Sequence, residues 1–201
     1  MKIPSDLPII SFASQDAWEA WLEEHHATAP GLWLQLAKKG SGHPSVTYDE
    51  AVEVALCFGW IDGQKQSYNE EYFLQKFTPR RPRSVWSKVN TQRVQRLIEQ
   101  GRMRPAGMKH VESAKQDGRW DAAYASGASA DVPEDFLTAL EAHPAAKAFF
   151  ATLTKANQYA IYFRIHTARN PELRRTRIEK IVAMLAEGKT FHRQKAREPQ
   201  S

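Results

Sequence analysis

The chain has 201 residues, 42% of them hydrophobic and 25% charged, with a formal net charge of +5, and this ordinary globular composition excludes a largely disordered chain. The single cysteine, Cys57, excludes a disulfide framework and any zinc or iron–sulfur site built from several thiolates. No apolar run approaches the roughly 20 residues that span a bilayer, and the first residues form no apolar signal segment, so we expect a cytoplasmic protein without membrane insertion.

The first part of the chain predicts an α+β domain over residues 1–83. Thr47, followed by Glu50 three residues later, forms a capping box that predicts the start of a helix, and Gly59 is typical of the residue just past a helix end. Aromatic residues at alternate positions predict two strands joined around Asn69. The expected elements are, in chain order, a strand at 9–12, a helix over 15–27, a strand at 32–37, a helix over 47–58 and strands at 60–67 and 72–78.

After residue 83 the pattern is helical, and we expect a helical domain over 84–192 followed by a flexible tail over 193–201. The pair Asn170-Pro171 is a strong helix start, and Gly188 is a natural helix end. The expected helices are, in chain order, 88–100, 103–116, 134–142, 145–153, 155–167 and one from Pro171 to before Gly188. The predicted fold class is therefore α+β and mostly α overall, with a small N-terminal sheet and two helices followed by a C-terminal helical bundle.

Charge is distributed in four blocks of alternating sign. The net charge is −7 over 1–75, +9 over 76–119, −4 over 120–154 and +7 over 155–201. The basic blocks can form an anion-binding face for nucleic acid, phosphate or an acidic partner. We favour the other interpretation, in which basic helices pack beside acidic elements of the same chain, because blocks of opposite sign neutralise one another within one fold.

Sequence motifs of the common enzyme classes are absent. The chain contains no P-loop, no Gly-x-Gly-x-x-Gly after a strand, no His-Glu-x-x-His and no Gly-x-Ser-x-Gly. Cys57 lies on the apolar side of an expected buried helix, which favours a core thiol over a nucleophile. The seven histidines show no spacing typical of metal ligands. The sequence therefore predicts no catalytic residue, no metal site and no cofactor, and it favours a non-enzymatic protein.

One stretch, from Phe58 to Asn90, concentrates residue types that bind anions. Three arginines lie beside two prolines, and guanidiniums can hold a carboxylate or phosphate through paired hydrogen bonds. Polar side chains follow at an expected helix N-terminus, which also favours an anion. The candidate ligand-binding residues are Trp60, Asp62, Arg80, Arg81, Ser84, Trp86 and Asn90. The alternative is an interdomain hinge, in which Asp62 pairs with Arg80 or Arg81, the tryptophans are core residues and Ser87 only caps the helix.

The unusual motifs of this region occur in a fixed order: residues 55–63 (ALCFGWIDG), 77–81 (FTPRR), 84–90 (SVWSKVN), 101–107 (GRMRPAG) and 114–120 (AKQDGRW). In these motifs, and more weakly in the basic final helix, the chain resembles the bacterial YdeI/OmpD-associated family, often labelled bacteriocin-protection proteins. The resemblance covers about residues 10–190. It implies a role in protection against bacteriocins or antimicrobial peptides and association with an outer-membrane porin, and it implies no enzymatic activity, cofactor or catalytic residue.

We therefore expect a cytoplasmic, non-enzymatic protein of this family that acts by binding a small anionic ligand or a protein partner. One alternative is an enzyme on a small anionic substrate, with Asp62 as the base and the arginines as an electrophilic clamp. A second alternative, ranked last, is a nucleic-acid-binding protein, because the basic stripe of the final helix is interrupted and the sequence shows no known nucleic-acid module. The sequence does not predict the oligomeric state.

Overall fold

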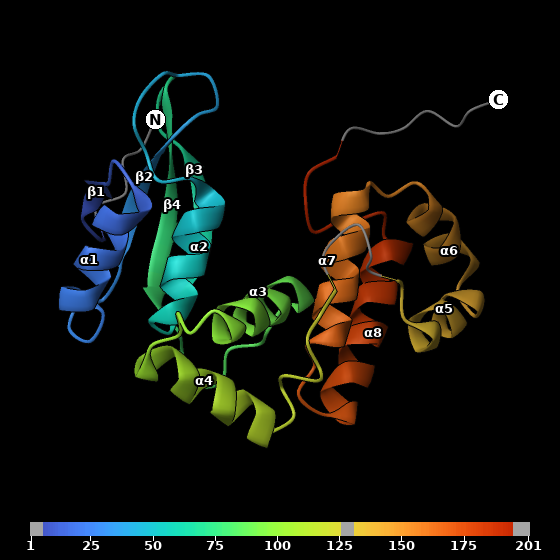
Figure 1. Cartoon of the computed structure of the whole chain (residues 1–201). Coiled ribbons are helices and arrows are strands. Elements are labelled where there is room, and N and C mark those ends of the chain that lie inside the picture. Colours follow the sequence, from blue (N-terminus) through green and yellow to red (C-terminus); the bar gives the residue numbers. More distant parts are fainter. Residues whose placement is uncertain (1–5, 126–130, 195–201) are drawn as a thin grey trace. The chain divides into compact units, whose positions relative to one another are not determined.

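The structure, a computed structural model, describes residues 6–125 and 131–194 and combines a four-stranded sheet with eight helices in this described part (Figure 1). The predicted fold class, α+β and mostly helical, is confirmed. No helix among the described residues is long and apolar enough to cross a bilayer.

The sheet has the strand order β1-β2-β4-β3. Its strands are β1 (Ile9–Ser11), β2 (Leu32–Ala37), β3 (Trp60–Ser67) and β4 (Tyr72–Pro79). β1 pairs with β2 in parallel, and β4 pairs antiparallel with both β2 and β3. Asn69 closes the hairpin between β3 and β4, because its side-chain Oδ1 accepts hydrogen bonds from the backbone N–H groups of Glu71 and Tyr72.

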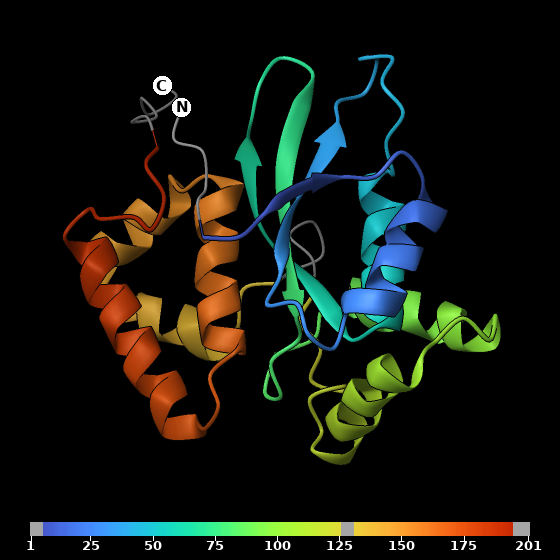
Figure 2. The ribbon, with the colours of Figure 1, turned by 90° about the vertical axis from the view of Figure 1, so that its left-hand side faces the viewer.

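Two helices, α1 (Gln15–His25) and α2 (Tyr48–Cys57), pack side by side against the sheet (Figure 2). The predicted capping box at the start of α2 is confirmed, since the Thr47 hydroxyl accepts from the backbone of Glu50 and the Glu50 carboxylate accepts from the backbone of Thr47. Gly59 follows α2 with a φ of +73°, a left-handed conformation that glycine adopts without strain.

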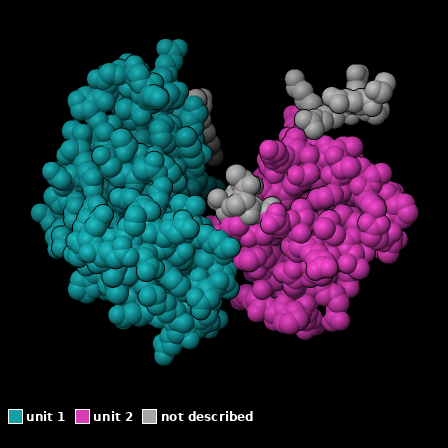
Figure 3. All heavy atoms as spheres, turned by 45° about the vertical axis from the view of Figure 1, so that its right-hand side comes forward, with its two compact units in different colours: residues 1–123 teal, residues 124–201 magenta. Residues whose placement is uncertain are grey.

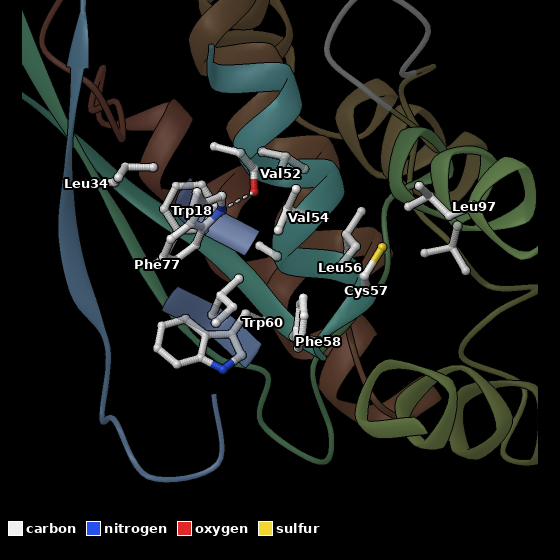
Figure 4. Packing of buried hydrophobic residues seen from close by; sticks show 14 of the residues in the cluster. Trp18, Leu34, Val52, Val54, Leu56, Cys57, Phe58, Trp60, Phe77 and Leu97 are labelled. Carbon is white, nitrogen blue, oxygen red and sulfur yellow. Dashed lines mark hydrogen bonds between the residues drawn. The ribbon is translucent and has the colours of Figure 1, made fainter. Parts of the chain in front are cut away.

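Aromatic and aliphatic side chains of α1, α2 and the sheet form the first core (Figure 4). Trp18 of α1 is fully buried at its centre, and its indole Nε1 donates to the backbone carbonyl of Ala51, 3.1 Å away. Cys57 is buried in the same core, and burial raises the pKa of its thiol to about 11. The thiol is therefore part of the packing, as the apolar side of the predicted helix indicated.

The chain divides into two compact units, residues 1–123 and 124–201 (Figure 3). This division lies later in the chain than residue 83, because α3 (Lys88–Glu99) and α4 (Pro105–Gln116) both pack on α2. The approach of α4 is close: a Cβ atom at Gly107 would lie only 2.3 Å from the backbone carbonyl oxygen of Cys57.

The second unit is helical and has its own core of buried aliphatic and aromatic side chains. Its helices are α5 (Glu134–Glu141), α6 (Pro144–Ala151), α7 (Lys155–His166) and α8 (Pro171–Ala186). As predicted, Asn170 caps α8, because its Oδ1 accepts from the backbone N–H of Leu173 at 2.7 Å. Most of the tail predicted over 193–201 lies outside the described residues.

Candidate functional site

Trp60, at the start of β3, is a core residue. It is 1% exposed, and its indole Nε1 donates to the backbone carbonyl of His26, 3.0 Å away. Its ring meets those of Trp18 and Trp21 edge-on, at centroid distances of 6.3 and 5.9 Å. Trp60 therefore contributes to packing and presents no surface to a ligand.

Asp62, two residues further along β3, is bound to α2. Its Oδ2 accepts a hydrogen bond of 2.7 Å from the hydroxyl of Tyr48. Burial and the Asp62 carboxylate raise the pKa of Tyr48 well above its usual range, so the phenol remains a donor at physiological pH. Within residues 6–125 and 131–194, no lysine or arginine forms an ion pair with Asp62.

Arg80 and Trp86 lie in contact after the end of β4. Arg80 is only 4% exposed, and its Cζ lies 3.6 Å from the centre of the Trp86 ring. Its Nη2 donates to the backbone carbonyl of Val85 at 2.6 Å. Because a guanidinium stacks favourably on an indole face, this contact offsets part of the cost of burying the charge.

The segment between Arg80 and α3 is tied to residues that come much later in the chain. The carbonyl of Ser84 accepts a hydrogen bond of 2.9 Å from Arg119, and the ring of Trp86 packs 5.1 Å from that of Trp120. Arg119 also binds both carboxylate oxygens of Asp117, at 2.8 Å each, and this contact lowers the pKa of Asp117. The segment is therefore anchored at several points.

Asn90 lies in the first turn of α3. Its backbone N–H donates to the Ser87 hydroxyl at 3.2 Å, so Ser87 is the N-cap of the helix. The structure thus brings Arg80, Ser84 and Trp86 together, with Asn90 just beyond them. It places Trp60 in the core and Asp62 beside α2.

Three residues that the sequence did not single out complete this site: His110, Arg119 and Trp120. Burial, and then the positive charge of Arg80, lower the pKa of His110. A Cβ at Gly59 would lie 2.8 Å from the His110 ring, so the glycine makes room for it. Arg119 and Trp120 end the motif of residues 114–120, but no local pattern places them or His110 beside the arginines, because that proximity arises only when the chain folds.

Most basic side chains of α3 and of the segment leading into α4 are neutralised by acidic residues of α1 and α2. The ion pairs are Arg93–Asp49, Arg96–Glu53, Arg102–Glu53, Arg104–Glu19 and Arg104–Glu23. For this part of the chain, the interpretation that basic helices pack beside acidic elements is therefore confirmed. The paired residues lie between 43 and 85 positions apart along the chain, so these ion pairs join the elements of the first unit.

Positive charge also remains exposed in a segment that we call the basic loop, residues 80–88. Arg81, Arg83 and Lys88 are exposed, and no carboxylate of the described residues lies within ion-pair distance of them. The loop leads directly into α3, whose first backbone N–H groups carry the positive end of the helix dipole. Guanidiniums, an ammonium and a helix N-terminus together can hold a carboxylate or a phosphate.

Two family models match the chain. Residues 10–110 match a Domain of unknown function (DUF8412), and residues 129–188 match the family described as Bacteriocin-protection, YdeI or OmpD-Associated. No curated protein and no solved structure matches. The predicted resemblance is thus confirmed in the second unit, whereas most of the motifs that carried it, and the basic loop, lie in the stretch matched by DUF8412. The chain therefore belongs to the DUF8412 family through its residues 10–110, and its residues 129–188 are similar to the family described as Bacteriocin-protection, YdeI or OmpD-Associated.

Proposed function

We propose that this protein acts by binding an anionic ligand at the basic loop, and that it does so without catalysing a reaction. The observation that carries the proposal is the distribution of ion pairs. The arginines of α3 are bound to acidic residues of α2, whereas Arg81, Arg83 and Lys88 keep their charge exposed at the surface. An exposed cluster of uncompensated cations attracts and holds anions.

The basic loop is held in position before any ligand arrives. Within the loop, Arg80 is stacked on Trp86, and the backbone N–H of Ser84 donates to the carbonyl of Arg81 at 3.0 Å. The prolines at 79 and 82 restrict the backbone further. Because less conformational entropy is lost when the binding segment is already ordered, this arrangement favours affinity.

The two alternative functions have weaker support. An enzyme using Asp62 as its base requires that carboxylate beside the arginines, but Asp62 is hydrogen-bonded to Tyr48 on α2. Two of the basic side chains that a nucleic-acid-binding face on α8 would use are engaged within the protein. Arg174 binds Asp135 and the carbonyl of Ile165, and Arg177 donates to the carbonyl of Arg164. These arginines hold the C-terminal end of α7.

The family description adds a physiological context, protection against bacteriocins. We propose that capture of an anionic ligand by the basic loop is the molecular step behind such a role in this chain. The ligand's negative charge follows from the charge of the loop, and a cationic peptide would be repelled there. A protein partner of the loop would present carboxylates or phosphates to it.

The test is a thermal-shift titration of the full chain with inorganic pyrophosphate and with citrate. Ligand at about 100 times its dissociation constant adds roughly 2.7 kcal/mol to the free energy of unfolding, which gives a clear rise in Tm. The double variant Arg81→Ala/Arg83→Ala should lose this rise. The control Arg169→Ala/Arg175→Ala removes the same charge from exposed positions in the second unit and should keep it. An absent rise, or an equal loss in both variants, would refute the proposal.

A further inference from the structure

We propose that a hollow beside the basic loop binds the base of a nucleoside phosphate. The inference rests on the proposed function, because the phosphate would be the anion that the loop holds. The hollow has a volume of about 370 Å³ and is lined by Thr91, Gln92, Gln95 and Arg96 of α3 and by Trp120. This volume lies within the range of sites for small molecules, about 300–1,000 Å³.

Trp120 supplies a fixed aromatic surface. It is partly buried against the first core, and its ring packs 5.1 Å from that of Trp86. The ammonium of Lys115 lies 5.3 Å from the centre of the same ring. Every nucleobase has a π-face that stacks on such a ring, and the Lys115 ammonium, which lies over the ring, suits a ligand that carries negative charge.

Gln92 and Gln95 supply side-chain amides that can form hydrogen bonds with a ligand. They are three residues apart on α3, so they lie on one side of the helix, and both are exposed. In the described part of the chain, neither side-chain amide has a hydrogen-bond partner. An amide offers a donor and an acceptor in one plane, and this pair matches the edge of a base such as adenine.

Arg96 adds a cation at the same hollow. Its side chain is 57% exposed, and its contact with Glu53 is long, at 3.4 Å. A guanidinium with five donors retains several for a ligand after one such contact. Arg96 can therefore contribute to anion binding as well as to the pairing of α3 with α2.

The hollow and the basic loop are neighbours. Thr91 lies one helical turn after Lys88, and its hydroxyl donates to the Lys88 carbonyl at 2.9 Å. Trp86 touches both Arg80 of the loop and Trp120 of the hollow. A ligand with a planar ring at one end and phosphate at the other therefore fits this surface. A single stacking ring accommodates a single base, so we infer a mononucleotide and not a strand.

The test is isothermal titration calorimetry of the full chain with AMP, adenosine and inorganic phosphate. We expect AMP to bind at least tenfold more tightly than either fragment. Gln92→Ala/Gln95→Ala should weaken AMP about tenfold and leave phosphate unchanged. The control Gln100→Ala/Gln116→Ala alters two exposed glutamines outside the hollow and should bind AMP normally. Trp120→Leu should also weaken AMP binding and leave phosphate binding unchanged. If Trp120→Leu fails to fold, the Gln92→Ala/Gln95→Ala variant still decides the test.

The outcomes separate this inference from the proposed function. If phosphate binds through Arg81 and Arg83 but AMP binds no more tightly than phosphate, base binding in the hollow is refuted and anion binding at the basic loop is supported. If AMP binding depends on the glutamines and is unaffected by Arg81→Ala/Arg83→Ala, base binding in the hollow is supported and anion binding at the basic loop is refuted. Binding of a short oligo(dA), measured at two salt concentrations, distinguishes a mononucleotide ligand from single-stranded nucleic acid. Tighter, steeply salt-dependent binding of the strand would overturn the mononucleotide in favour of single-stranded nucleic acid.

Discussion

Arg80 is stacked on Trp86 with 3.6 Å between the guanidinium carbon and the ring centre, and both side chains are at least 96% buried. This pair buries one positive charge of the basic loop. Buried in this way, Arg80 acts as a positioning residue, and the exposed Arg81 and Arg83 are the groups that can contact a ligand.

Replacing Trp86 by phenylalanine should cost less stability than the same change at Trp60. Both tryptophans are buried, but Trp60 Nε1 donates to the carbonyl of His26, whereas Trp86 Nε1 has no hydrogen-bond partner in the described part of the chain. Trp60→Phe would leave a carbonyl without its donor, a further cost of about 1–2 kcal/mol. Urea unfolding of the two variants measures the difference. Equal losses would show that the indole hydrogen bond adds nothing.

Gly107→Ala should strongly destabilise the first unit. The added Cβ would lie 2.3 Å from the backbone oxygen of Cys57 and 2.6 Å from that of Leu56, and backbone cannot move aside as a side chain can. We expect a loss of about 3 kcal/mol or more in the free energy of unfolding, since α4 must shift away from α2. Gly63→Ala is the matched control, because its Cβ would meet nothing closer than 3.7 Å. A Gly107→Ala protein as stable as this control would mean that α4 does not approach α2 closely.

Stability should fall as the pH drops below about 6.5, and His110 should account for part of this fall. Burial and the charges of Arg80, Lys109 and Arg119 lower the pKa of His110 below its ordinary value of 6.5. The unfolded chain therefore takes up a proton at this position first, so the free energy of unfolding decreases from pH 6.5 down to the lowered pKa and then levels off.

Urea unfolding at pH 7.5 and pH 5.5 checks this linkage. His110→Asn should reduce the stability difference between the two pH values. His143→Asn, at an exposed position in the second unit, should leave the difference as it is in the unaltered protein. A pH dependence that is the same in all three proteins would contradict the role of His110.

Asn157→Ala should release the segment that follows α8. Asn157 is 1% exposed, and its side chain binds the backbone N–H and carbonyl of His192 at 2.8 and 3.0 Å and the side chain of Gln194 at 2.8 Å. Because the alanine variant removes all these contacts, tryptic cleavage after Arg193 should accelerate severalfold. Gln158→Ala, on the same helix, serves as the control. Unchanged cleavage in Asn157→Ala would mean that other contacts hold the segment.

Interactions between residues close in the sequence were sufficient to predict most of the helices and strands. The capping box at Thr47 and Glu50 and the cap at Asn170 depend on atoms three residues apart, so the sequence contains everything that they need. The expected start of α4 at Met103 was early, because Pro105 occupies the first helical position and Arg104 keeps extended backbone angles. Helix starts of this kind can be found from the sequence once the proline is read as the first residue.

Which residues form the site could be identified only from the tertiary structure. Trp60 and Trp86 are both tryptophans in the same motif-rich region, yet one is sealed in the core and the other supports Arg80. Their roles differ because each depends on partners far along the chain, His26 for the first and Trp120 for the second. A pattern of neighbouring residues contains no information about such partners.

The alternation of charge along the chain was visible in the sequence, and it indicated that basic and acidic blocks would pair. Which cations remain after pairing was decided only when α3 packed on α2, because an ion pair such as Arg93–Asp49 forms across 44 residues. The loop that holds Arg81, Arg83 and Lys88 extends beyond the reach of those carboxylates. The net charge of each block therefore follows from composition alone. The exposed charge of the basic loop depends on how far its cations lie from the carboxylates of the folded protein.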